Sequence, residues 1–490
     1  MERIVPGLAR PLHDAEGTRR LEQAAAAALP SHTLMQRAGL AVARLAGALA
    51  PHARSAWVAC GPGNNGGDGL EAAALLADHG LQVTVTWLGQ EDRIPPDAGA
   101  SLARARAAAV NFSMQPPAQF DLAIDALFGL GQARILEGAA EAAAHLNTAR
   151  DEGALVLAVD LPSGLAADTG ATMGPIVRAS HTLSLLTLKP GLFTAQGRDA
   201  AGEVWFDDLG LPTQAEADAT GSASRPIAWL CSAPVHRSRQ HASHKGSHGD
   251  VAVVGGAPGM VGAALLAASA ALHAGAGRVF AAILDGGSMT ADTAQPELMF
   301  RHPEDLDFAT LHLACGCGGG QAVRQVLPRA LSTARSLTLD ADALNAIAGD
   351  TQLMTLLQAR GARGFATVLT PHPLEAARLL GTTAAAVQAD RLGAARQLVD
   401  ATSAVVVLKG SGTVIAAPGE LPRINPTGNA RLATGGTGDV LAGWISALQA
   451  QGLGAFKAAC EAVYAHGAVA DRWPDSAAPL VASALARSAR

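Results

Sequence analysis

The sequence has little charge, and that charge is not biased towards the positive sign. Charged residues make up 16% of the 490 residues, and the formal net charge is −6 at pH 7. A nucleic-acid-binding protein usually carries a surplus of Lys and Arg, which this chain does not have. Because 49% of the residues are hydrophobic, the composition is typical of a globular protein, and we expect a small-molecule substrate and no nucleic-acid partner.

Long apolar runs are also scarce. The longest uncharged stretch, residues 251–277, is interrupted by glycines and by Pro258. It therefore predicts a strand, a glycine-rich loop and an alanine-rich helix, and not a membrane span. Residues 1–17 mix charges, prolines and glycine without the apolar core of a secretory signal, so we expect a cytoplasmic protein without a membrane partner.

Cysteine is sparse as well. The five cysteines are odd in number and scattered, at positions 60, 231, 315, 317 and 460. Cys315 and Cys317 lie close together, but no second cysteine pair accompanies them, and the histidine cluster at positions 236, 241, 244 and 248 lies in a distant Ser/Arg/Gly-rich loop whose spacings of five, three and four match no standard zinc pattern. This spacing predicts reduced thiols and not a zinc site.

Glycine, in contrast, is concentrated in two blocks. Residues 61–69 read Gly-Pro-Gly-Asn-Asn-Gly-Gly-Asp-Gly, between a short apolar run and an apolar-periodic one. Without Cβ atoms, main-chain N–H groups can approach a phosphate at a helix N-terminus, so we expect a ligand loop. Residues 433–439, Ala-Thr-Gly-Gly-Thr-Gly-Asp, form the second block. Two blocks in a chain of this length predict two domains with an active site in each.

Apolar runs alternate with helical patterns in both halves, which predicts parallel sheets covered by helices. In the first half we expect strands at 57–60, 81–88, 121–127, 155–161 and 182–188, and helices at 14–28, 34–49, 70–79 and 137–150. In the second half we expect strands at 250–255, 278–284, 311–314, 336–340, 366–370 and 405–409, and a helix at 440–448. The polar stretch 212–226 predicts a linker.

Polar residues of the first half fall at the carboxyl ends of these strands, where α/β sheets bind ligands. Oxygen atoms of Asn65, Asp125 and Ser163 would form a cage suited to a hard cation. Asp160 would then remain free as an acid or base. Such residues also commonly cap turns and helices, which is the better reading of any single Asp. Three of them beside one glycine loop favour a site.

The second glycine block suggests phosphoryl transfer. Gly438 and its neighbours can present N–H groups to a transferring phosphoryl group, and Asp439 at the helix start can take a proton from a hydroxyl. Gly-Thr-Gly-Asp could equally be only a helix cap, and the motif alone is weak. The surrounding string, residues 425–443, is more specific.

These motifs together closely resemble the bifunctional NAD(P)H-hydrate repair enzymes, in which an epimerase domain precedes an ADP-dependent dehydratase domain. The likeness rests on residues 34–39, 61–69, 125–131 and 159–164 in the first half, and on 370–373, 409–413 and 425–443 in the second. It implies an α/β protein with an N-terminal Rossmann-like three-layer domain over 1–215, followed by a ribokinase-like α/β domain over 225–490.

For the epimerase domain, the resemblance implies a potassium ion held by Asn65, Asp125 and Ser163, and Asp160 as the proton-transfer residue. The hydrated dinucleotide, NADHX or NADPHX, would be contacted by Asn64, Asn65, Gly66, Gly67, Asp68, Gly129, Leu130, Gly131, Gln132, Ala133, Arg134, Ile135 and Asp160.

For the dehydratase domain, the resemblance implies ADP as co-substrate with Mg²⁺, and Asp439 as the base. The nucleotide would be bound by Lys409, Gly410, Ser411, Gly412, Thr413 and Gly438. The hydrate would be bound by Gly262, Ala263, Gly318, His372 and Asp439. His372 would orient the substrate, although a buried structural histidine is nearly as good a reading.

The chain departs from the family pattern at two positions: Cys317 replaces a usual proline, and Leu374 replaces a usual glycine. Both departures bear on the Gly318 and His372 contacts. Two other functions remain open from the sequence: a ribokinase-like ATP-dependent small-molecule kinase with a regulatory front half, and a scaffold whose front half binds partners. The sequence also leaves the oligomeric state open, a homo-oligomer included.

Overall fold

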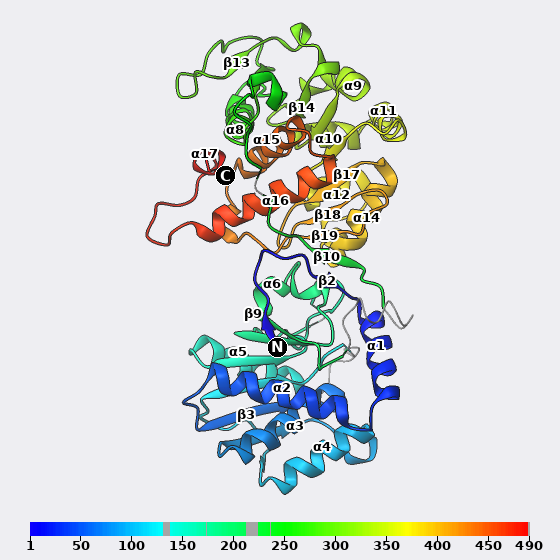
Figure 1. Ribbon diagram of the computed structural model, residues 1–490, viewed down its shortest axis with the longest axis vertical. Coiled ribbons are helices and arrows are strands. Elements are labelled where there is room, and N and C mark those ends of the chain that lie inside the picture. Colours follow the sequence, from blue (N-terminus) through cyan, green and yellow to red (C-terminus); the bar gives the residue numbers. More distant parts are fainter. Residues whose placement is uncertain (131–137, 173, 212–223, 236, 489–490) are drawn as a thin grey trace. The chain divides into compact units, whose positions relative to one another are not determined.

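The computed structural model describes residues 1–130, 138–172, 174–211, 224–235 and 237–488. The chain divides into two compact units (Figure 1). Unit 1 comprises Met1–Val5 and Arg10–Ala228, and unit 2 comprises Pro6–Ala9 and Trp229–Arg490. Most of the linker expected at 212–226 lies outside the described residues. Among the helices that are described, none combines the length and the apolarity needed to cross a membrane.

Unit 1 contains an eight-stranded sheet in the order β1-β9-β8-β7-β6-β3-β4-β5. All of its neighbouring strands are parallel except β1 and β9. Their bounds are β1 Glu2–Arg3, β3 Ser55–Cys60, β4 Gln82–Trp87, β5 Asn111–Phe112, β6 Leu122–Ala126, β7 Leu155–Val159, β8 His181–Leu185 and β9 Glu203–Asp207, and the short strand β2 is Pro11–Leu12. From β3 the strand order proceeds to β4 on one side and to β6 on the other. The carboxyl ends of β3 and β6 therefore form a topological switch point, where a ligand crevice is expected.

Helices cover both faces of this sheet. The helices are α1 Ala15–Ala28, α2 Thr33–Leu49, α3 Asn64–Asp78, α4 Pro96–Ala107, α5 Ala139–Asp151 and α6 Gly197–Ala200. Alternate side chains of β3 face opposite layers, since Val58 packs in the core with α2, α3 and α4, whereas Trp57 packs in the core with α5. The result is the predicted three-layer arrangement.

Unit 2 contains a larger sheet, in which the order β13-β12-β11-β14-β15-β16-β17-β18-β19-β10 can be followed. It is parallel from β13 to β17, and β18 runs antiparallel to both β17 and β19. The bounds are β10 Ala228–Leu230, β11 Asp250–Gly255, β12 Arg278–Ile283, β13 Met299–Phe300, β14 His312–Cys315, β15 Ser336–Leu339, β16 Thr367–Leu369, β17 Val405–Leu408, β18 Val414–Ala416 and β19 Arg423–Ile424. The switch point here lies between β11 and β14.

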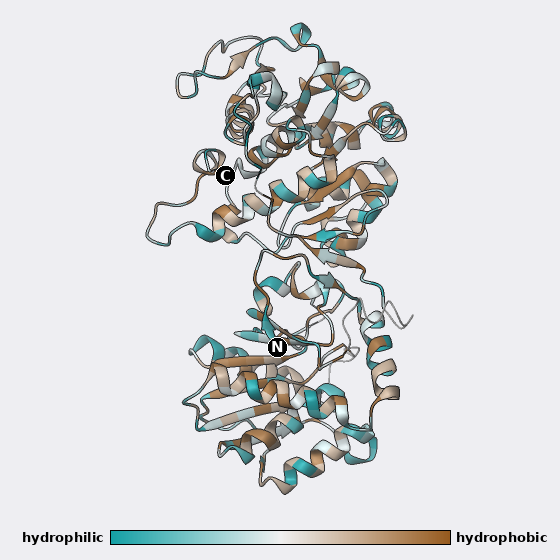
Figure 2. Cartoon of the chain, in the orientation of Figure 1, coloured by the Kyte–Doolittle hydropathy of each residue, from teal (hydrophilic) through white to brown (hydrophobic). Residues whose placement is uncertain are grey.

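This sheet is also covered on both faces. One core cluster joins β14 and β15 to α9, α10 and α11, and two others join the sheet to α8, α15 and α16. The helices are α8 Val261–His273, α9 Val323–Thr333, α10 Asp342–Ala348, α11 Thr351–Ala362, α12 Pro373–Leu380, α13 Ala384–Ala389, α14 Arg391–Thr402, α15 Thr437–Ala450, α16 Ala455–Arg472 and α17 Ala482–Ala486. In Figure 2 hydrophobic residues colour much of the covered strands in each unit.

Helices at the two glycine blocks begin earlier than predicted, at Asn64 and not at residue 70, and at Thr437 and not at residue 440. Glycines of the first block allow close packing inside the helix: a Cβ on Gly66 would lie 2.0 Å from the Gly61 carbonyl oxygen. Strands β7 and β8 end two and three residues earlier than predicted, because Asp160 and Leu186 adopt positive φ angles of 65° and 64° immediately after them.

Candidate active sites

The described residues of unit 1 surround a cavity of about 1130 Å³. This volume exceeds the range of about 300–1000 Å³ that is usual for small-ligand pockets, so the cavity has room for a dinucleotide. Several predicted site residues line it, namely Asn64, Asn65, Asp68, Gly129, Leu130 and Asp160. The predicted contacts at residues 131–135 lie outside the described residues.

Asp125 and Ser163 do not line the cavity themselves, but they are joined to each other by hydrogen bonds beside Phe128, which does. Ser163 Oγ donates to Asp125 Oδ1 at 2.6 Å, and the Ser163 N–H donates to Oδ2 at 2.8 Å. Ser163 Oγ in turn accepts from the Phe128 N–H at 2.9 Å. Burial raises the pKa of Asp125 to about 6 despite these hydrogen bonds. Among the described residues, Asp125 forms no ion pair with a basic side chain.

Asn65 adds a third oxygen near this pair. Its Oδ1 lies 3.0 Å from the position that a Cβ on Gly129 would take, so the amide faces the turn that follows β6. The amide nitrogen of Asn65 is buried without a hydrogen-bond partner. An amide oxygen, a serine hydroxyl and a buried carboxylate lacking a basic neighbour are the donors a hard cation prefers. The predicted cation ligands therefore fit such an ion.

Asp160 faces a buried lysine that the sequence did not single out. Lys189 Nζ donates to Asp160 Oδ1 and, at 2.7 Å, to the Leu185 carbonyl oxygen. Lys189 is fully buried, and desolvation lowers its pKa although Asp160 opposes the shift. The pair combines a carboxylate at the cavity wall with a fixed ammonium group behind it, so it can hold and move a proton.

Two further carboxyl groups extend this polar wall. Burial raises the pKa of Asp68 well above its ordinary value, and the nearby charges of Glu22 and Asp160 raise it further. Glu22, from α1, has a pKa raised by burial and accepts a hydrogen bond from Asn64 Nδ2 at 3.5 Å. Both carboxyl groups line the cavity, so a ligand bound there would contact them.

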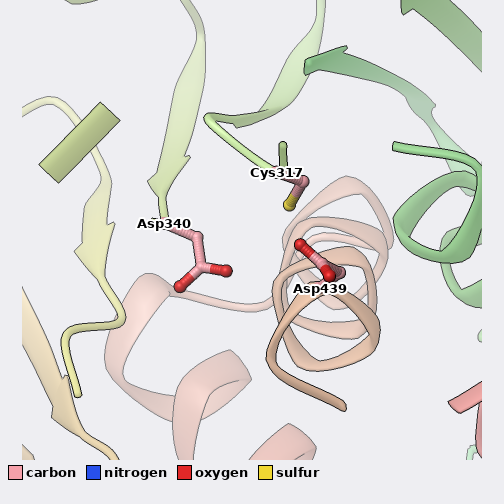
Figure 3. Close-up of side chains that lie close together, drawn as sticks. All are labelled: Cys317, Asp340 and Asp439. Carbon is pink, nitrogen blue, oxygen red and sulfur yellow. The ribbon is translucent and has the colours of Figure 1, made fainter. Parts of the chain in front are cut away.

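The unit 2 site lies at the second switch point, where the turn after β14 meets the end of β15 and the start of α15. Figure 3 shows Cys317, Asp340 and Asp439 pointing toward one another from these elements. Ligand atoms of the three side chains lie within 4.8 Å of one another. Lys409 Nζ, just after β17, donates to Asp340 Oδ1 at 2.6 Å. The predicted base Asp439 thus lies in a buried group containing a second acid and a lysine.

Asp439 has the protonation behaviour expected of a general base near neutral pH. Burial raises its pKa to about 7, and the charge of Asp340 adds to the rise, whereas a hydrogen bond with Cys317 and the charge of Lys409 lower it. Asp439 lies in the first turn of α15, whose unpaired N–H groups favour an anion. A carboxylate with this pKa can accept a proton from a hydroxyl at pH 7.

Lys409 also brings the predicted nucleotide segment to the glycine block. A Cβ on Gly438 would lie 3.2 Å from Lys409 Nζ, so Gly438 lies directly beside the ammonium group. Arg391, which is fully buried, donates to the Leu408 and Lys409 carbonyl oxygens at 3.0 Å and 3.2 Å. These hydrogen bonds hold the backbone at the start of the Lys409–Thr413 segment in place. A lysine and glycine N–H groups at one point can bind a diphosphate.

The predicted hydrate contacts lie on neighbouring segments. A Cβ on Gly318, whose φ is +58°, would meet Ala263 Cβ at 2.9 Å and the Met260 carbonyl oxygen at 2.7 Å. Gly262 is exposed at the start of α8, with open space around it. Since Gly318 follows Cys317, these residues are adjacent to the Asp439 group.

His372 is the N-cap of α12, with Nδ1 accepting from the Leu374 and Glu375 N–H groups at 3.1 Å and 3.3 Å. Its side chain is 47% exposed, so the alternative of a buried structural histidine is wrong. Glu375 Oε1 lies 3.3 Å from Nε2 of His372. The Leu374 side chain is exposed, so the departure from glycine at this position leaves the cap intact.

Three residues of these sites were missed from the sequence: Glu22, Lys189 and, as a site residue, Asp340. A signal existed for Asp340, which ends a strand in Asp-Ala-Asp, and for Lys189, a lone charge after an apolar strand. Glu22 had none, since an acid on an amphipathic helix usually faces solvent.

Comparison with known proteins agrees with the two-site arrangement. A family model described as NAD(P)H-hydrate dehydratase matches residues 251–489, and another described as YjeF-related protein N-terminus matches residues 31–191. The chain is 38% identical over 477 residues to the bifunctional NAD(P)H-hydrate repair enzyme of Escherichia coli (strain K12). The aligned residues cover 93% of this chain and 88% of that protein.

Other relatives match one half. The ADP-dependent (S)-NAD(P)H-hydrate dehydratase of Neisseria meningitidis serogroup B is 44% identical over 266 residues, covering 52% of this chain and 88% of that protein. Among solved structures, the ADP/ATP-dependent NAD(P)H-hydrate dehydratase from Bacillus subtilis co-crystallised with ATP/Mg²⁺ has 31% identity and a TM-score of 0.43, covering 52% of this chain and 91% of that chain. The predicted fold class of two successive α/β domains, the first of three layers, is confirmed, and the second domain matches the NAD(P)H-hydrate dehydratase family model. Given the identity and coverage of its full-length relatives, the chain belongs to the family of bifunctional NAD(P)H-hydrate repair enzymes.

Proposed function

We propose that the chain repairs hydrated nicotinamide dinucleotides with two active sites. Residues 1–215 interconvert the R and S forms of hydrated NADH and NADPH, and residues 225–490 dehydrate the S form at the expense of ADP. The products are NADH or NADPH, AMP and phosphate. The observation that carries this proposal is the Asp439 group, in which a carboxyl group with a pKa of about 7 lies beside Lys409 and the glycine block.

In the dehydratase site, Asp439 accepts the proton of the substrate's ring hydroxyl as that oxygen attacks the terminal phosphorus of ADP. The bond between this phosphorus and the bridging oxygen breaks, and AMP leaves. Phosphate is a better leaving group than hydroxide, so it then departs with the bonding electrons while an adjacent ring carbon loses a proton. This elimination restores the nicotinamide double bond.

The charge that develops on the transferring phosphoryl group is stabilised by Lys409 and by the N–H groups at Gly438. We assign nucleotide binding to the Lys409–Thr413 segment and hydrate binding to the segments at Gly262, Ala263, Gly318 and His372. Mg²⁺ would accompany the ADP phosphates and neutralise part of their charge. Asp340 and Asp342 are nearby carboxylates that could hold it, directly or through water, because Mg²⁺ prefers oxygen ligands.

In the epimerase site, Asp160 is the proton-transfer residue that assists inversion at the hydroxyl-bearing ring carbon. It protonates the hydroxyl, so that the C–O bond breaks and water leaves as the neighbouring ring nitrogen supplies its electron pair, and it takes the proton back from the water that adds to the opposite face of the ring. Lys189 keeps Asp160 in place and holds a proton within reach. The substrate would lie in the cavity against Asn64, Asn65, Asp68, Gly129 and Leu130. Asp68 and Glu22 line the same cavity and would face the bound substrate.

A potassium ion fits the oxygen atoms of Asn65, Asp125 and Ser163. When bound, it supplies the positive charge that buried Asp125 lacks among its described neighbours. It would thereby fix the turns after β3, β6 and β7 around the substrate.

Product analysis tests this proposal. The purified chain is incubated with the S hydrate of NADH, ADP and Mg²⁺, and the nucleotides and phosphate are quantified. We expect one AMP and one phosphate for each NADH formed. Accumulation of a stable phosphorylated metabolite from ATP, without phosphate release, would instead establish the small-molecule kinase.

A further inference from the structure

The thiol of Cys317 lies among the acids of the unit 2 site. Its Sγ and carboxylate oxygens of Asp340 and Asp439 all lie within 4.8 Å of one another, and Figure 3 shows the three side chains converging. Cys317 is fully buried, and Asp340 is nearly so. The donors come from the turn after β14, the end of β15 and the first turn of α15. Spacing along the chain predicted no zinc site, because it cannot reveal a group whose members come from three separate segments.

The side-chain hydrogen bonds from Lys409 and Thr370 to Asp340 involve only one of its two carboxylate oxygens. Asp340 Oδ1 accepts from Lys409 Nζ at 2.6 Å and from Thr370 Oγ1 at 2.7 Å. The second oxygen, Oδ2, lies 3.8 Å from the position of a Cβ on Gly438, beside the start of α15. Because the ligand atoms of the three side chains lie within 4.8 Å of one another, one oxygen of each acid and the sulfur can surround a single cation.

We propose that Cys317, Asp340 and Asp439 form a binding site for a thiophilic divalent cation such as Zn²⁺, Cd²⁺ or Co²⁺. Thiolate sulfur selects soft and borderline metals, and one sulfur with two carboxylate oxygens leaves the fourth tetrahedral position open to water. On binding, the metal–sulfur bond replaces the S–H bond and the proton passes to solvent. The negative charges of the thiolate and the two carboxylates then balance those of the cation and the Lys409 ammonium group.

Asp340 and Asp439 would interact differently with Mg²⁺ and with a thiophilic cation. Mg²⁺ demands oxygen ligands in near-octahedral geometry, so the sulfur gives it no advantage here. A thiophilic cation coordinated by Asp439 occupies the oxygen that would accept the substrate's proton, so it blocks dehydration. This inhibition rests on the proposed function, whereas metal binding itself does not.

Cobalt titration of the full-length protein in excess Mg²⁺ tests the site directly. Tetrahedral thiolate-bound Co²⁺ absorbs by sulfur-to-metal charge transfer, a readout that is independent of catalysis. We expect one equivalent to bind with this absorption in the wild-type protein. Cys317→Ala should remove the absorption and weaken Co²⁺ binding by at least about tenfold. Losses of this size follow when a residue that supports a metal site is removed.

Two control variants identify the thiol. Cys315→Ala removes a buried thiol two residues earlier, and Cys460→Ala removes the partly exposed thiol that interacts with Cys231. Both should keep the absorption. Asp439→Asn, which preserves the shape of the side chain and every thiol, should weaken Co²⁺ binding as well, and it decides the matter if Cys317→Ala does not fold.

Absorption that is missing from the wild-type protein, or that survives in Cys317→Ala, overturns the proposal. Loss of the absorption in Cys315→Ala or Cys460→Ala with Cys317 intact overturns it equally. In activity assays, Zn²⁺ should inhibit dehydration while epimerisation by the same protein continues. If the chain proves to have no dehydratase activity, the absorption still tests the metal site.

Discussion

Burial raises the pKa of two key carboxyl groups that have different surroundings. It raises the pKa of Asp125 to about 6 and that of Asp439 to about 7. Asp125 is surrounded by hydrogen-bond donors of Ser163 and Leu127, whereas Asp439 has the ammonium group of Lys409 nearby and the charge of Asp340 opposing it. The first arrangement suits a cation ligand, and the second suits a base.

Asp439 should set the pH dependence of dehydration. Its carboxyl group can accept a proton only when ionised, so the rate should rise with pH through a midpoint near 7. Asp439→Asn should lower the rate by about 10²–10⁴-fold at every pH and remove the midpoint. Initial rates of NADH formation across the pH range check this. A variant that keeps the wild-type profile would contradict the assignment.

Lys189 should be required by the epimerase site alone. Lys189→Met leaves Asp160 without its buried partner, so epimerisation should fall by about 10²-fold or more. The loss of one member of a buried ion pair should also lower the free energy of unfolding of unit 1 by about 3–5 kcal/mol. Chiral separation of the hydrates and urea unfolding measure the two effects. Lys189→Arg keeps the charge and serves as control, and unchanged epimerisation by Lys189→Met would refute the role.

At the scale of elements, the glycine blocks were predicted as loops before helices, and the helices include part of them. The predicted strand ends were close because apolar runs mark buried strands, yet two strands stop at a residue with positive φ, which an apolar run does not signal. The positions of Asp125, Ser163 and Asp439 could be predicted, because Asp125 lies near the end of a strand, Ser163 follows one, and Asp439 lies at the start of a helix. Lys189 and Glu22 could not, since their burial depends on what packs over them.

The glycines of α3 should be required for packing. Gly66→Ala would place a Cβ 2.0 Å from the Gly61 carbonyl oxygen, and overpacking of this kind costs about 1–3 kcal/mol of unfolding free energy. Gly47→Ala, in α2, is the matched control because no atom lies within 4 Å of the added Cβ. That change should stabilise the protein by about 0.4–1 kcal/mol. Urea unfolding of both variants is the measurement, and equal effects would contradict the packing role.

The turns after β3, β6 and β7 should be stabilised by potassium. Adding K⁺ should raise the unfolding temperature of unit 1 relative to tetramethylammonium at equal ionic strength, because a ligand that binds only the folded state stabilises it. Asp125→Asn removes the charged ligand and should abolish the difference. Calorimetry measures both proteins. A potassium effect of equal size in the variant would show that the ion binds elsewhere.

On the scale of the whole molecule, each unit has its own sheet, its own switch point and its own acid–base group. The sites share no described residue, so either can be removed by substitution without altering the other. Sequence patterns predicted this organisation well, because polar residues follow the apolar parallel strands and mark their carboxyl ends.

Recovery of reduced nicotinamide from mixed R and S hydrates of NADH, with ADP and Mg²⁺, tests the two-site account most directly. Wild-type protein should restore the full absorbance, because each epimer reaches the dehydratase. Asp160→Asn should restore the S fraction at the normal rate and then slow to the uncatalysed epimerisation, and Asp439→Asn should restore almost none. Full recovery by Asp160→Asn at the wild-type rate, or recovery of one epimer alone by the wild-type protein, would contradict it.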